Sequence, residues 1–179
     1  NIYNFYGSAS VSAGIYILAN NTDWIISGNN IYQTASRAGN ATNNYGIYIS
    51  NTGNNFNVTS NNIGGGAASC GGSAWTYTLS GATKFLPIYL SVGSTTASSV
   101  QNNTIANISL SSSSGATTLP GVFGGIYLQS GNANIGTVTG NVIGTVAGPI
   151  SVTTSTSGGV SMGIGSTATG TASISNNTI

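Results

Sequence analysis

A six-residue motif recurs along the chain, and its repetition restricts the fold more than any other feature of the sequence. The motif reads [V/I]-x-x-N-x-I, and the chain opens on the tail of a further copy, Asn1-Ile2. The final isoleucines, counted from Ile2, are 29, 32, 42, 38 and 36 residues apart. The five complete copies are Ile26–Ile31, Val58–Ile63, Val100–Ile105, Val138–Ile143 and Ile174–Ile179. A repeat of this length indicates structural units that stack on one another.

A second apolar segment lies between successive copies of the Asn motif. Its copies are Gly14–Ile17, Gly46–Ile49, Pro87–Leu90, Gly125–Leu128 and the weaker Gly163–Gly165. The first Ile of each copy precedes the next Asn motif by 11, 11, 12, 12 and 10 residues, whereas it follows the previous motif's Ile by 13, 16, 25, 21 and 21. Because insertions in a solenoid collect on one face, we predict that loops are inserted at one corner of each coil.

The pattern within these segments predicts β-strands. Ile15 and Ile17 should point to one side and Tyr16 to the other, since side chains alternate along a strand. A third short strand is expected after the Asn motif, where apolar residues recur three positions later. This spacing is found at Ile2-x-x-Phe5, Ile105-x-x-Ile108 and Ile143-x-x-Val146, but not at Ile63-Gly64-Gly65-Gly66.

These features favour a parallel β-helix over leucine-rich repeats, which need runs of leucine, and over propellers, which need four strands per blade. We predict an all-β chain that forms one β-helix segment over residues 1–179, with three short strands per coil and about five coils of roughly 29–42 residues. The predicted coils span residues 2–30, 31–62, 63–104, 105–142 and 143–179.

The recurring asparagines predict a ladder at the corner that follows a strand. Residues in successive coils should lie ~4.8 Å apart, asparagine tolerates left-handed backbone, and its amide both donates and accepts hydrogen bonds. We expect a structural role for these residues rather than ligand binding. The predicted ladder consists of Asn29, Asn61, Asn103, Asn141 and Asn177.

The tyrosines of the second segment are the best candidates for a binding surface. They alternate with inward isoleucines, so they should project outward and stack on one face. Aromatic rings can bind sugars or pack against a partner. The alternative is stacking between coils that stiffens the helix, with the inserts folded over the rings. The candidate residues are Tyr16, Tyr48, Tyr89 and Tyr127.

Charge is nearly absent, and this excludes several functions. An average domain is roughly 25% charged, whereas this chain is 2% charged, with Asp23, Arg37 and Lys84 as its only charged side chains. Two isolated cations cannot neutralise the phosphates of a nucleic acid or hold an anionic membrane surface. No stretch approaches the ~20 apolar residues of a spanning helix, so membrane insertion is not expected.

Catalysis is also not expected. Glycoside hydrolysis generally uses two carboxylates, calcium sites draw on several oxygen ligands, and His-dependent triads or metal sites need the histidine that this chain lacks. The single cysteine, Cys70, has no His partner. We predict that the chain is not an enzyme and holds no metal or cofactor; a polysaccharide lyase would need an active site outside this segment.

Ice binding is a further alternative, less favoured by the sequence. It requires a flat, regular face of threonines, and Thr59, Thr139, Thr153 and Thr154 do not recur coil by coil.

The N-x-I corners, the G-I-Y-[I/L] strands and the Ser/Thr/Gly-rich inserts resemble the parallel β-helix repeats of very large secreted proteins and adhesins of Bacteroidota-type bacteria. The resemblance covers the whole chain. It implies a right-handed helix, a secreted or cell-surface location, and a role as a structural shaft, display segment or extracellular filament.

Both ends of the chain lie in register with the repeat. We therefore expect either a slice of a longer chain or a subunit that stacks end to end. The expected partners are neighbouring coils or other copies of the chain and, if the tyrosines bind a ligand, a glycan or another cell-surface molecule.

Overall fold

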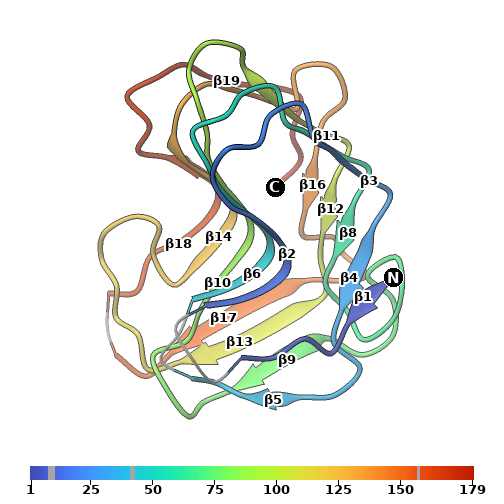
Figure 1. Cartoon of the computed structure of the whole chain (residues 1–179). Coiled ribbons are helices and arrows are strands. Elements are labelled where there is room, and N and C mark those ends of the chain that lie inside the picture. The colour runs from blue at the N-terminus through green and yellow to red at the C-terminus, as the bar shows by residue number, and fades with distance from the viewer. Residues whose placement is uncertain (8–10, 41–42, 157) are drawn as a thin grey trace.

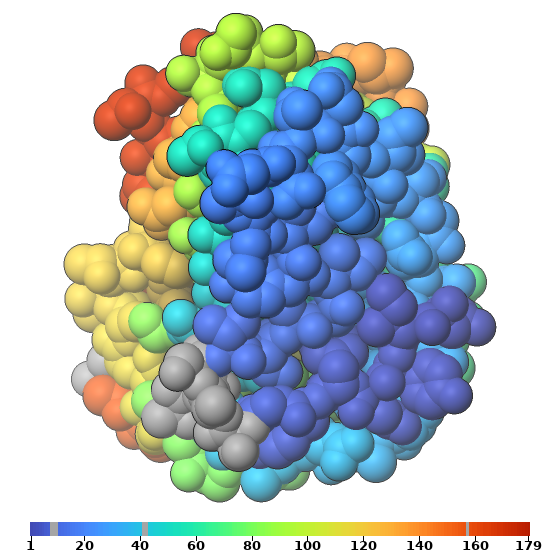
Figure 2. Space-filling model, in the orientation of Figure 1, coloured from blue at the N-terminus to red at the C-terminus, as the bar shows by residue number. Residues whose placement is uncertain are grey.

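The chain forms a right-handed parallel β-helix, which confirms the predicted fold class. The computed structural model describes residues 1–7, 11–40, 43–156 and 158–179, and these residues contain strands but no helix. Seen from the N-terminal end, the chain runs clockwise as it recedes from the viewer (Figure 1), with the first coil in front (Figure 2). The described residues accordingly include no helix that could span a membrane.

The described strands form four parallel sheets, which we name A to D. The chain passes through them in the order A, D, B, C and then returns to A (Figure 1). Sheet A contains β1 (Ile2–Tyr3), β4 (Asn30–Tyr32), β8 (Asn62–Ile63), β12 (Thr104–Ile105) and β16 (Val142–Ile143). Sheet D contains β5 (Arg37–Ala38), β9 (Trp75–Thr78), β13 (Ile108–Ser112) and β17 (Ile150–Thr154).

The other two sheets carry the second segment and the start of the Asn motif. Sheet B contains β2 (Val11–Ile17), β6 (Asn43–Ser50), β10 (Lys84–Ser91), β14 (Phe123–Ser130) and β18 (Ser161–Ser166). Sheet C contains β3 (Ile25–Ser27), β7 (Asn57–Thr59), β11 (Ser98–Gln101), β15 (Ala133–Ile135) and β19 (Ala172–Ile174).

A full coil therefore has four strands, and the prediction of three was wrong. The Asn motif contains two of them: Val58 lies in sheet C and Ile63 in sheet A. Between them the chain turns a corner at the residue before the ladder asparagine, which has a positive φ in four of the five motifs. These residues are Gly28 (68°), Ser60 (57°), Asn102 (55°) and Asn176 (58°). The left-handed residue is thus the neighbour of the ladder asparagine rather than the ladder asparagine itself.

The register of the motifs agrees with the prediction in sheets A and B. Ile2, Ile31 and Ile63 pair in succession in sheet A. In sheet B, Tyr16 pairs with Tyr48, which pairs with Tyr89. The apolar motif positions therefore stack coil upon coil over the core, where Ile47, Ile88 and Ile126 have no exposed surface.

Two predicted alignments in the last coils were wrong. Val138 is 84% exposed, and Ile135 instead pairs with Val100 and Ile174. A five-residue turn, 136–140, separates Ile135 from Asn141. The connection between β14 and β15 is correspondingly shorter, so the total length from sheet B to the ladder asparagine stays similar. Val146 is likewise fully exposed, and Ile150 takes the expected place by pairing with Ile108.

The inserts lie at both ends of sheet D rather than at one corner. Residues 64–74 and 144–149 separate sheet A from sheet D, whereas residues 79–83, 113–122 and 155–160 separate sheet D from sheet B. The first insert explains why no apolar residue lies three positions after Ile63. The residue that pairs with Ile108 is Trp75, which follows the insert.

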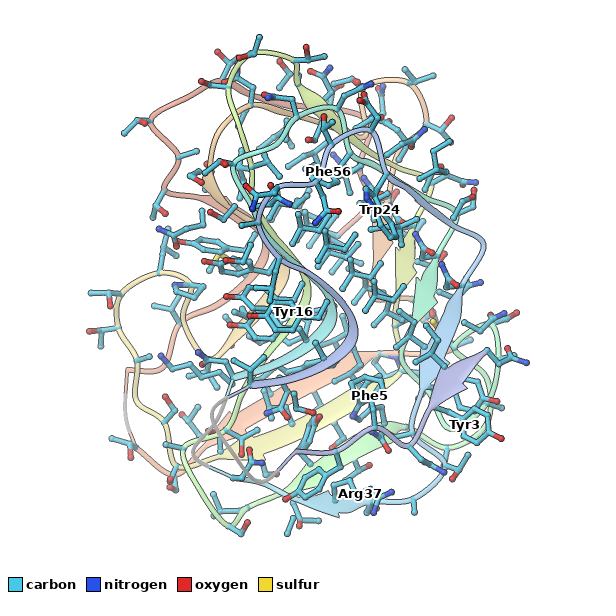
Figure 3. All side chains as sticks on the ribbon, viewed as in Figure 1. Tyr3, Phe5, Tyr16, Trp24, Arg37 and Phe56 are labelled. Atoms are coloured by element: carbon cyan, nitrogen blue, oxygen red, sulfur yellow. The ribbon has the colours of Figure 1, made fainter. Side chains whose placement is uncertain are left out.

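Aromatic side chains fill the core where sheets D and B meet. Trp75 packs against Phe85 with ring centroids 4.8 Å apart, and Phe85 packs edge-on against Phe123 at 6.4 Å. Phe5 points inward from the first coil (Figure 3) and meets Trp75 edge-on at 5.6 Å. Rings from different coils thus contact one another in the core, which joins the coils.

Candidate functional site

The five predicted asparagines form a hydrogen-bonded ladder through all the coils. The Nδ2 atom of Asn61 donates to Oδ1 of Asn103 at 3.0 Å, and Nδ2 of Asn103 donates to Oδ1 of Asn141 at 2.9 Å. Asn29 makes the same bond to Asn61 at 3.0 Å, and Asn141 makes it to Asn177 at 2.8 Å. The ladder runs without a break although the spacing of its residues in sequence varies.

Each inner asparagine uses its amide fully. Besides its bond to Asn141, Nδ2 of Asn103 donates to the carbonyl of Val58 at 2.9 Å. Oδ1 of Asn103 accepts hydrogen bonds from the backbone N–H and from Nδ2 of Asn61, each at 3.0 Å. Asn61, Asn103 and Asn141 have no exposed surface. A buried amide is costly unless its donors and acceptors are paired, so the arrangement is suited to joining coils and leaves no group for a ligand.

The four predicted tyrosines lie on the outer side of sheet B and form a column, which consists of Tyr16, Tyr48, Tyr89 and Tyr127. Ring centroids are 4.7 Å apart between Tyr16 and Tyr48, 4.9 Å between Tyr48 and Tyr89, and 5.6 Å between Tyr89 and Tyr127. Figure 3 shows Tyr16 at the front of this column. Tyr45, which the repeat pattern did not single out, stacks on Tyr48 at 4.1 Å with the two rings nearly parallel (9°).

Exposure of the tyrosines decreases along the column. The ring of Tyr16 is 47% exposed, Tyr48 and Tyr89 are partly exposed, and Tyr127 is buried, with its hydroxyl 2.6 Å from Oγ1 of Thr167 in the next coil. Burial raises the pKa of Tyr89 to about 12 and also raises that of Tyr45. The ring of Tyr48 is stacked by Tyr16 and Tyr45, whereas Tyr89 meets it edge-on, so neighbouring rings cover part of the faces within the column.

In the last coil the tyrosine is replaced by Gly165. It pairs with Tyr127 in register, and the side chain of Met162 lies over it, so that a Cβ at this position would collide with the Met162 sulfur. Met162 therefore fills the place of the missing ring.

The charged groups do not converge. Oδ1 of Asp23 accepts a hydrogen bond from Nδ2 of Asn55 at 2.7 Å, and the Arg37 guanidinium lies over the ring of Tyr6 at 5.7 Å. Within the described ranges, no group of three or more His, Cys, Asp or Glu side chains could hold a metal ion. Cys70 lies in the insert of residues 64–74, where burial raises the pKa of its thiol.

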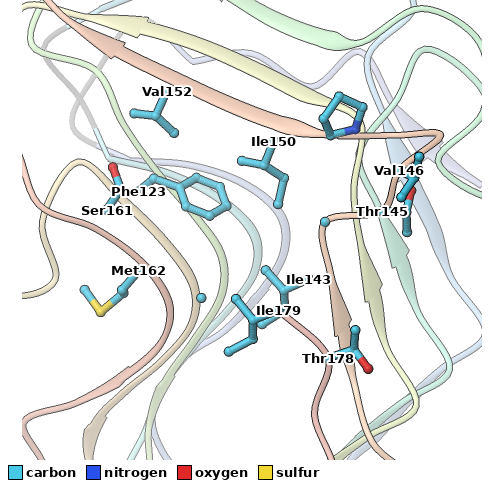
Figure 4. Close-up of a pocket in the computed structure, with 13 residues that line it drawn as sticks. Phe123, Ile143, Thr145, Val146, Ile150, Val152, Ser161, Met162, Thr178 and Ile179 are labelled. Carbon is cyan, nitrogen blue, oxygen red and sulfur yellow. The ribbon is translucent and has the colours of Figure 1, made fainter.

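An apolar pocket opens in the last coil. It has a volume of about 750 Å³ and lies between sheets A, B and D (Figure 4). Its wall contains Phe123, Ile143, Ile150, Val152 and Ile179. These are inward-facing positions of the coils, so the pocket is the open end of the core rather than a polar site for catalysis.

Sequence comparison adds no family assignment. The chain matches no protein-family model, no curated protein and no solved structure. The fold and the candidate sites therefore rest on the repeat pattern and on the contacts described above.

One regular surface was missed by the sequence analysis. Outward side chains of sheet D carry hydroxyl groups in three successive coils. They are Thr76 and Thr78 on β9, Ser109 and Ser111 on β13, and Ser151 and Thr153 on β17. A search for recurring threonine alone could not find this surface, because serine occupies half of its positions and inserts of different length precede each strand.

Proposed function

We propose that the chain is a non-catalytic shaft or display segment of a secreted cell-surface protein, such as an adhesin or an extracellular filament. The observation that carries the proposal is the asparagine ladder, which joins all five coils by paired, buried amides. A structure in which each coil is held by its neighbours gains length and stability by adding coils. This property suits a segment that holds another domain away from the cell surface.

The low charge supports the same role. Since few groups change protonation around neutral pH, the stability of the stack should depend little on pH or salt, which vary outside the cell. The secreted location itself rests on the resemblance to β-helix repeats of surface proteins.

The two ends of the ladder favour further coils as partners. Oδ1 of Asn61 accepts two bonds from Asn29, and a preceding asparagine could bond Asn29 in the same way. At the other end the apolar pocket of the last coil could receive the inward side chains of a following coil. We propose that these surfaces join neighbouring coils, either of one longer chain or of stacked copies.

A carbohydrate-binding role for the tyrosines is the alternative. The stacked rings favour the packing interpretation, because sugar rings bind aromatic faces and the faces here contact one another. Screening of the folded chain against a glycan array, with Tyr48→Ala and Tyr89→Ala for comparison, tests this. Binding that both substitutions abolish, in variants that remain folded, would support the alternative.

The shaft proposal is tested by surface display. The chain is placed between a cell-surface anchor and a terminal epitope, and the distance of the epitope from the membrane is measured by super-resolution microscopy. We expect the epitope to be accessible and protease-resistant at a height set by the coils. Loss of that height in an Asn61→Ala/Asn103→Ala variant would support the ladder as its cause; a collapsed or degraded native segment would contradict the proposal.

A further inference from the structure

We propose that the outer face of sheet D binds the surface of ice crystals, a function separate from the shaft and not required by it. The face is formed by β9, β13 and β17, which run in the same direction one behind another (Figure 1). We call it the hydroxyl face, and it consists of Thr76, Thr78, Ser109, Ser111, Ser151 and Thr153.

The register arranges these hydroxyl groups in two rows. Ser109 pairs with Thr76 on one side and with Ser151 on the other, which forms the first row. Ser111 pairs with Thr153, and Thr78 occupies the corresponding position of β9 in the second row. The inward residues between the rows, Tyr77 and Leu110, are buried in the core and fix the outward direction of their neighbours.

The spacing of the hydroxyl face is regular in two directions. Residues two apart on a strand are separated by roughly 6.6 Å, and paired residues on adjacent strands by ~4.8 Å. The distance between strands is close to one repeat length of the oxygen lattice on the prism faces of ice. A surface with hydroxyl groups at such positions can hold water molecules where the crystal would place them.

The hydroxyl groups are available to water. Thr78, Ser151 and Thr153 are exposed, and Thr76, Ser109 and Ser111 are partly exposed. In the described part of the chain the hydroxyls of Ser109, Ser111 and Ser151 have no hydrogen-bond partner. The Thr76 and Thr78 hydroxyls donate to the carbonyls of Ala74 (3.0 Å) and Arg37 (3.3 Å), so their oxygens can still accept.

The hydroxyl face also lacks charged groups. Charged side chains orient water around themselves in ways that differ from ice, and none occurs on β9, β13 or β17. The nearest charged residue of the sheet is Arg37 on β5, and its guanidinium lies over Tyr6. Flat hydroxyl arrays also occur on neutral polysaccharide crystals, so that ligand is included in the test below.

The experiment measures partition of the folded chain into a growing ice crystal and the shape of that crystal. We expect faceted crystals and at least twofold enrichment in ice over a non-binding control protein. The variant Ser109→Tyr/Ser111→Tyr blocks the centre of the hydroxyl face and should lose the enrichment. Ser99→Tyr, an outward change on sheet C, is the matched control and should keep it.

A second variant tests the face by gain of activity. Ser109→Thr/Ser111→Thr/Ser151→Thr keeps every hydroxyl and adds methyl groups that suit a strand, so we expect at least a twofold larger freezing-point depression. Circular dichroism melts establish that each variant is folded. Enrichment no higher than that of the control protein, with no gain in the threonine variant, would overturn the proposal. Binding of the chain to crystalline cellulose without enrichment in ice would also overturn the proposal. Either result leaves the shaft proposal standing, because the asparagine ladder does not involve this face.

Discussion

Replacement of Asn103 by alanine tests the ladder at a position where all of its bonds are present. The substitution removes the acceptor for the backbone N–H and Nδ2 of Asn61 and the donor to the carbonyl of Val58. Asn141 keeps one donor, because the backbone N–H of residue 103 still reaches its Oδ1. Nδ2 of Asn61 still donates to the carbonyl of Ile26, so two buried groups are left without the partner they had. At ~1–3 kcal/mol for each, the free energy of unfolding should fall by about 2–6 kcal/mol. A domain of this kind is stable by roughly 5–15 kcal/mol in total, so the variant should be close to unfolding.

The assay is equilibrium unfolding in urea, followed by circular dichroism and by the fluorescence of the buried Trp75. The matched control is Asn62→Ala, which lies next to the ladder on the outer side of sheet A and loses one bond of 3.2 Å to Asn30. We expect this control to cost less than about 1 kcal/mol, as for a partly exposed hydrogen bond. Equal losses in the two variants would refute the reasoning, since the ladder would then contribute no more than a surface asparagine.

An Asn103→Asp variant adds a test with a defined sign. One carboxyl oxygen would keep the two bonds from Asn61, whereas the other would face the carbonyl of Val58 and Oδ1 of Asn141, which both accept hydrogen bonds. Burial beside acceptors raises the pKa of the folded-state carboxyl above that of the unfolded chain. Stability should therefore be greatest below the unfolded pKa of ~4 and decline as the pH rises through the folded pKa. A variant that is equally stable at pH 3 and pH 7 would contradict this account.

Three further predictions concern the tyrosines and the scarcity of charge. Tyr77→Phe removes a buried hydroxyl that has no hydrogen-bond partner among the described residues, so the urea midpoint should stay constant or rise; a marked fall would show that the hydroxyl is paired. Tyr127→Phe breaks the 2.6 Å bond to Thr167, and we expect it to lower stability by about 0.5–1.5 kcal/mol in the same assay, with no change as the contrary result. The native chain should keep its stability between about pH 4 and pH 9 and lose it above pH ~10, because the unfolded tyrosines then ionise while burial raises the pKa of Tyr89 to about 12 and that of Tyr45 still further. Urea midpoints at pH 7, 9 and 11 measure this, and an unchanged midpoint at pH 11 would contradict it.

The repeated motifs made sheets A and B and the ladder predictable. Stacking of Ile31 on Ile63 and of Tyr48 on Tyr89 follows from alignment of identical residues. Such positions keep one residue type, because each must fit the same neighbour above and below. Asn103 was recognised for the same reason, since its amide bonds to the amides of the equivalent asparagines in the coils before and after it.

Sheet D could not be predicted in this way. Its equivalent inward positions hold Trp75, Ile108 and Ile150, so the residue type is not kept from coil to coil. The inserts on both sides vary in length, so counting from the nearest motif gives no fixed spacing. Variable loop length also explains why the sequence pattern placed Val138 at the position that Ile135 occupies. The turn after Ile135 is longer than in the other coils and the loop before β15 is shorter, so the overall spacing of the motifs hardly changes.

Burial of the tyrosines also depends on contacts that the motif does not contain. Tyr127 is covered with the help of Thr167 from the next coil, and Tyr48 is stacked by Tyr45 from outside the repeated segment. The sequence could place the rings on one outer face, but it could not show that the column's own rings and neighbouring residues would cover most of them.

The central claim is that the coils form a shaft that extends by adding coils of the same kind, and a tandem chain tests it most directly. Two copies are joined in register, so that Ile179 of the first takes the place of Ile2 in the second, and small-angle X-ray scattering measures the longest dimension of the product. Five further coils at ~4.8 Å each should lengthen the particle by about 24 Å without changing its cross-section, with one cooperative unfolding transition at a higher temperature than the single chain. A tandem chain that scatters as two separate bodies, with the melting temperature of the single chain, would contradict the account.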